Sequence, residues 1–105
     1  MNHDVLDSLY AAKRELTRVI VATASQTLPP DALQQLLQQR DQVVWTINRF
    51  LVANLTSSLA QINQACASID DSTKRLKDLA STADDVAKAI NIASQVIGAA
   101  TGLLG

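Results

Sequence analysis

Hydrophobic and small residues near the amino terminus recur at alternating steps of four and three. The positions are Val5, Leu9, Ala12, Leu16, Val19 and Thr23. With 3.6 residues per turn, these steps place the side chains along one side of an α-helix. The basic residues Lys13, Arg14 and Arg18 mostly fall on other sides. The pattern predicts an amphipathic helix over about residues 3–27.

Two prolines interrupt this pattern in the sequence Leu28-Pro29-Pro30-Asp31. Proline fits the first turn of a helix but not its interior, because it lacks a backbone N–H and clashes with the preceding turn. Asp31 would then lie in the first turn of a new helix, where a carboxylate interacts favourably with the helix dipole. A turn is therefore predicted at residues 28–30 (Leu-Pro-Pro).

Residues 31–97 contain neither proline nor glycine, and their hydrophobic pattern is helical throughout. The first part has its hydrophobic residues at Leu33, Leu37, Val44, Ile47 and Leu51. After a shift of four residues, which resembles a coiled-coil stutter, one position recurs every seven residues. It holds Leu55, Ile62, Ile69, Leu76, Ala83, Ile90, Ile97 and Leu104. A heptad repeat of this kind predicts coiled-coil-like packing.

A turn within this long segment would make the molecule compact. Asp70, Asp71 and Ser72 are good N-caps ahead of a new run of helix-forming residues, so a second turn is predicted near residues 70–72. Thr82 and Asp85 imitate a capping box and mark another candidate. The alternative is one unbroken helix, which would need partners along its whole length.

These elements predict a single all-α domain over residues 1–105. Its architecture is expected to be an antiparallel helical hairpin or a three-helix bundle with heptad packing. The predicted helices cover about residues 3–27, 31–69 and 73–100.

Charge and composition argue against some classes of function. The chain has nine basic and ten acidic residues for a net charge of −1, and both signs are spread along it. A nucleic-acid-binding protein usually carries a basic stripe and stacking aromatic residues. This chain has one Phe, one Trp and one Tyr. We therefore expect no nucleic-acid partner.

The residues that carry chemistry are few and scattered. The chain has one histidine (His3), one glutamate (Glu15) and one cysteine (Cys66). Catalysis needs an acid, base or nucleophile held in a pocket, and no known catalytic or metal-binding motif occurs in the sequence. We expect no catalytic residue, no cofactor and no metal site, and thus no enzyme.

The carboxyl-terminal residues 89–105 carry no charge and contain Gly98 and Gly102, spaced as in helix dimers of membranes. Asn91 and Gln95 interrupt this segment on one side, whereas a lipid-facing helix would be apolar all round. We therefore predict a helix with one buried face, and the glycines indicate close backbone contact or fraying. Insertion into a membrane is the alternative and is not favoured.

The amino terminus lacks the basic and apolar regions of a secretory signal peptide. A cytoplasmic location is predicted on this ground. Export by a signal-independent route stays open.

The function expected from these patterns is that of a non-catalytic interaction or structural subunit. It would self-associate or pack against the helices of a partner protein, because the heptad repeat exceeds what a small monomer needs. A membrane-active protein and a filament subunit are the alternatives. The residues predicted to make the contact are Trp45, Phe50, Leu55, Ile62, Ile69, Leu76, Ile90 and Ile97. Packing within the chain is expected to bury some of them, and for Trp45 and Phe50 the favoured interpretation is that these large aromatic side chains fill the widest part of the core.

Overall fold

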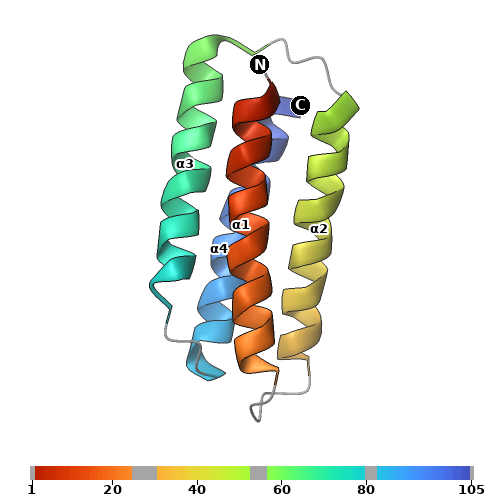
Figure 1. Ribbon diagram of the computed structural model, residues 1–105, viewed down its shortest axis with the longest axis vertical. Helices are drawn as coiled ribbons and strands as arrows, with labels where there is room; N and C mark the ends of the chain where they lie inside the picture. Colours follow the sequence, from red (N-terminus) through yellow and green to blue (C-terminus); the bar gives the residue numbers. More distant parts are fainter. Residues whose placement is uncertain (1, 25–30, 53–56, 80–82, 105) are drawn as a thin grey trace.

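The computed structural model describes residues 2–24, 31–52, 57–79 and 83–104. Within these ranges the chain forms four α-helices that pack side by side, and no strand occurs (Figure 1). Their bounds are α1 (Asn2–Thr23), α2 (Ala32–Val52), α3 (Leu59–Lys77) and α4 (Ala83–Leu104). The predicted all-α class is confirmed, but four helices replace the two or three that were predicted.

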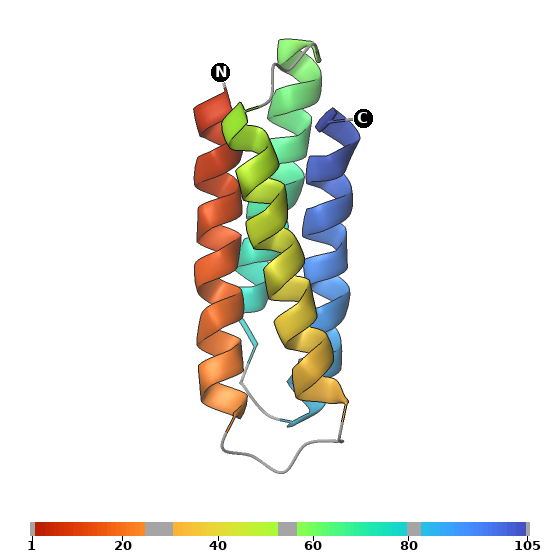
Figure 2. The same ribbon diagram turned by 90° about the vertical axis from the view of Figure 1, so that its right-hand side faces the viewer.

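The helices alternate in direction along the bundle, and both chain termini lie at the same end (Figures 1 and 2). α1 packs against α2 and α3, and α4 packs against the same two helices. α1 and α4 also touch across one diagonal, whereas the described residues of α2 and α3 make no contact. α2 and α3, which follow each other in the sequence, thus lie at opposite corners of the bundle.

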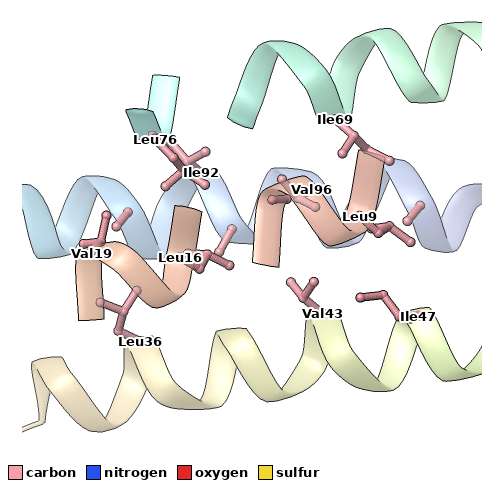
Figure 3. Packing of buried hydrophobic residues seen from close by; sticks show 14 of the residues in the cluster. Leu9, Leu16, Val19, Leu36, Val43, Ile47, Ile69, Leu76, Ile92 and Val96 are labelled. Carbon is pink, nitrogen blue, oxygen red and sulfur yellow. The ribbon is translucent and has the colours of Figure 1, made fainter. Parts of the chain in front are cut away.

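Each helix contributes one hydrophobic face to a shared core, into which the labelled side chains of Figure 3 converge. On α1, all six residues of the predicted stripe from Val5 to Thr23 are fully buried. The predicted face of the first helix is therefore confirmed. The Thr23 hydroxyl is satisfied within the helix, because it donates a hydrogen bond to the carbonyl oxygen of Val19 at 2.7 Å.

The buried face of α2 differs from the hydrophobic stripe in the sequence at all positions but Ile47. The buried hydrophobic residues are Leu36, Val43, Ile47 and Phe50. Leu33, Leu37 and Val44 are only half-buried, and Leu51 is exposed. The other buried residues each lie one position before Leu37, Val44 and Leu51, which corresponds to a rotation of about 100° around the helix. The buried stripe contains Phe50, the largest fully buried side chain of the described chain.

The predicted helix over residues 31–69 is also wrong, because α2 ends at Val52 and α3 begins at Leu59. A capping box starts α3. The Ser58 backbone N–H donates to Gln61 Oε1 at 3.0 Å, and the Gln61 N–H donates to Ser58 Oγ at 3.2 Å. Two of the free backbone N–H groups at this helix end are thereby satisfied.

The turn predicted near residues 70–72 is wrong, because these residues lie inside α3. Asp70 and Asp71 are exposed there, and Asp71 Oδ2 lies 3.5 Å from Arg75 Nε, one turn later. α4 begins at Ala83, next to the alternative site at Thr82 and Asp85. The turn predicted at residues 28–30 lies outside the described residues.

The heptad repeat holds through α3 but does not continue into α4. Ile62, Ile69 and Leu76 are buried in α3. The buried residues of α4 are instead Val86, Ala89, Ile92, Ala93, Val96 and Ala100. α3 ends at Lys77, so the helical phase is not maintained across the connection to α4. Arg18 of α1 helps to end α3, because its Nη2 donates to the carbonyl oxygen of Leu76 at 2.8 Å.

Candidate interaction surface

Half of the residues predicted to contact a partner belong to the chain's own core. Phe50, Ile62, Ile69 and Leu76 are buried between the helices. These side chains are not presented to a partner while the bundle is folded.

The other predicted contact residues differ in their surroundings. Ile90 and Ile97 are half-buried and pack against the core from α4. Leu55 lies outside the described residues. Among the predicted contact residues that the structure describes, only Trp45 projects from the bundle, with 58% of its surface exposed.

Trp45 lies on the side of α2 that faces away from the core. At 100° per residue, Trp45 and Val52 point roughly 180° to 200° away from the buried Val43. Val52 is 87% exposed. The exposed residues on this side, called the outer face of α2 below, are Gln38, Asp41, Gln42, Trp45, Asn48, Arg49 and Val52.

A cation–π contact holds the indole of Trp45 in place. The guanidinium carbon of Arg49 lies 4.9 Å from the centre of the Trp45 ring. Arg49 follows Trp45 by one helical turn, so the two side chains are neighbours on the helix surface. The contact orients the indole while leaving more than half of the side chain in water.

Three of the six large apolar side chains that are exposed in the described chain lie at one end of the bundle. Leu51 and Val52 end α2, and Leu59 begins α3 at the same end (Figure 1). Leu51 and Leu59 are each 57% exposed. From Phe50 to Ile69 the sequence has no charged residue. This end therefore combines apolar exposure with an uncharged stretch of chain.

The carboxyl-terminal segment forms α4 and packs into the bundle. Asn91 and Gln95 are exposed while Ala93, Val96 and Ala100 are buried, which agrees with the predicted sidedness. None of the helices in the described ranges is long and apolar enough to cross a membrane.

The two glycines of α4 make no close contact inside the bundle. Gly98 and Gly102 are exposed, and a Cβ added at either position would meet nothing within 4 Å. Close backbone packing around them, one of the two explanations drawn from the sequence, is therefore wrong within this chain.

The surface also has an open groove of about 310 Å³ between α3 and α4. Its walls are polar and small side chains, among them Gln61, Gln64 and Ser68 of α3 and Ala99 and Gly102 of α4. No group of three or more His, Cys, Asp or Glu side chains gathers at a metal-binding distance among the described residues. The groove therefore offers hydrogen bonds and van der Waals contacts but no charged side chain.

Comparisons with known proteins add no function. The sequence matches no family model, and no match is found among curated proteins or solved structures.

Sequence patterns pointed to Trp45 but missed the residues around it. Gln38, Trp45 and Val52 are spaced by seven residues, with Asp41 and Arg49 between them. This second stripe was available in the sequence. The hydrophobic pattern of residues 33–51 drew attention to Leu51 and left the neighbouring Val52 out.

Proposed function

We propose that this protein is a non-catalytic helical subunit that associates with copies of itself or with the helices of a partner protein. The observation that carries the proposal is the exposed outer face of α2. It presents the chain's only tryptophan, 58% exposed, and a valine that is 87% exposed. Tryptophan is the residue most characteristic of binding hot spots, because burying its large rigid surface stabilises a complex at little cost in conformational entropy.

The chemistry of the outer face suits a helix–helix contact. It carries one negative and one positive side chain, Asp41 and Arg49, and its other polar residues are amides. Side chains of this kind can satisfy their hydrogen bonds across an interface, whereas a dense cluster of charges would have to be desolvated. The surface is therefore better adapted to contact with protein than to a wholly solvated role.

Sedimentation velocity over a wide range of protein concentration tests self-association. The monomer mass is 11.2 kDa. We expect the weight-average mass to rise above this value as concentration increases. A mass that stays at the monomer value up to about 1 mM, where even contacts of only ~4 kcal/mol are populated, would contradict self-association.

A further inference from the structure

We infer that the outer face of α2 binds the same face of a second copy, in a two-fold symmetric antiparallel pair centred on Trp45. The inference rests on the self-association proposed above and specifies its surface and geometry.

The charges of the outer face complement themselves in this arrangement. Asp41 lies four residues before Trp45 and Arg49 four residues after it. A two-fold axis at Trp45 places residues equally far before and after Trp45 opposite each other. Asp41 of each copy then faces Arg49 of the other copy. A parallel pair would instead set like charges opposite each other, which is destabilising.

The remaining positions of the outer face also match. Gln42 falls opposite Asn48 of the second copy, so that two amides meet. Gln38 falls opposite Val52, where its aliphatic stem covers the exposed valine. The two Trp45 rings meet at the axis, where aromatic side chains pack in offset or edge-to-face arrangements.

The fold leaves these side chains accessible. α2 contacts α1 and α4 on its inner side. The Asp41 side chain is 74% exposed, and its ion pair with Arg40 is long, at 4.0 Å. Arg49 stacks on Trp45, so its positive charge lies on the outer face of α2. Both charges are therefore in place before a second copy arrives.

The size of the face sets the expected affinity. Gln38 to Val52 spans about 21 Å at 1.5 Å per residue. A contact between single helix faces of this length buries less than the ~800 Å² per partner of a standard interface. We therefore expect a reversible dimer with a dissociation constant in roughly the micromolar range or weaker.

Charge-reversal variants test the geometry by sedimentation velocity. Asp41→Arg places two arginine–arginine contacts in the dimer, and Arg49→Asp places two aspartate–aspartate contacts. Each single variant should dimerise about tenfold more weakly or worse. The double variant Asp41→Arg/Arg49→Asp should return to near the wild-type dissociation constant. An equimolar mixture of the two single variants should also dimerise, because both contacts then join opposite charges.

A matched control uses the same changes on another helix. Asp70 and Lys74 are exposed on α3, four residues apart. Asp70→Arg and Lys74→Asp should leave dimerisation unchanged. Circular dichroism confirms that each variant is folded.

The single tryptophan supplies an independent signal at the proposed axis. Its fluorescence emission should shift to shorter wavelength as the wild-type protein concentrates, because burial removes the indole from water. The single charge-reversal variants should show this shift only at higher concentration.

The outcomes separate this inference from the proposed function. A wild-type dimer that all charge variants leave intact would overturn the α2 pairing while self-association stands. A wild-type chain that stays monomeric would overturn both the α2 pairing and self-association, and the proposed function would then be left with a different partner protein. Loss in the single variants with recovery in the double variant and in the mixture would establish the antiparallel pair.

Discussion

Gly98 and Gly102 show how one residue type supports two opposite interpretations. Their spacing is that of helix dimers in membranes, where glycine allows backbones to approach. In the bundle both lie on the exposed side of α4, and a Cβ would meet nothing within 4 Å. Glycine in a helix then only costs conformational entropy in folding.

Replacing Gly98 by alanine is therefore expected to stabilise the protein by about 0.5–1 kcal/mol. For a domain of this size, the melting temperature should rise by roughly 2–8 °C. Thermal unfolding followed by circular dichroism measures the change. Gly102→Ala is the matched variant and should gain less, because it lies in the last turn of α4. A lower melting temperature for Gly98→Ala would reveal a close contact outside the monomer.

At the scale of a single helix, α2 provides two adjacent leucines in different surroundings. Leu36 is fully buried, whereas Leu37 is half-buried at the edge of the core. Leu36→Ala should lower the free energy of unfolding by about 2–5 kcal/mol, because it removes buried surface and leaves a cavity. Leu37→Ala should cost roughly 1–2 kcal/mol. Chemical denaturation compares the two variants. A larger loss of unfolding free energy for Leu37→Ala than for Leu36→Ala would contradict the finding that Leu36, not Leu37, faces the core.

The start of α3 depends on Ser58 and Gln61. Ser58→Ala removes the side-chain acceptor for the Gln61 N–H and should destabilise the protein by about 1 kcal/mol. Ser58→Asp keeps an acceptor and should be close to wild type. Ser68→Ala, on the exposed surface inside α3, controls for the loss of a serine hydroxyl. Equal melting temperatures for Ser58→Ala and wild type would show that the capping box contributes nothing.

The sequence predicted helical periodicity better than helix ends. The stripe of α1 is buried as predicted, and Ile62, Ile69 and Leu76 share one buried face of α3, because each set lies within one uninterrupted helix. The break before α3 was missed because no proline or glycine marks it. Ser58 and Gln61 did carry the signal, as a capping box at its usual spacing.

The heptad repeat does not predict the buried face of α4. It ran on from Leu76 to Ile90 and Ile97 across the end of α3, where periodicity in the sequence no longer reports a common face. The exposed position of Trp45 depends on how α2 is rotated about its axis. That rotation is set by packing against α1 and α4, which no local pattern records.

For the whole molecule, the bundle explains why an uncharged carboxyl-terminal segment can be a structural element. α4 contacts α1, α2 and α3, and it supplies buried residues such as Val86, Val96 and Ala100 to the shared core. α1 is the other helix that contacts three neighbours. The core residues of α1 to α3 would face water without α4, at a cost of roughly 25 cal/mol for each Å² of apolar surface.

Ending the chain after Leu79, which removes α4, should therefore abolish cooperative unfolding. Circular dichroism is expected to show reduced helicity and a gradual melting curve, because a small domain that loses one wall of its core falls below the stability it needs. Ending the chain after Ala100 is the control and should preserve a cooperative transition. If α4 were instead a separate membrane-inserting segment, residues 1–79 would unfold cooperatively at the temperature of the full chain. That result would contradict the four-helix core.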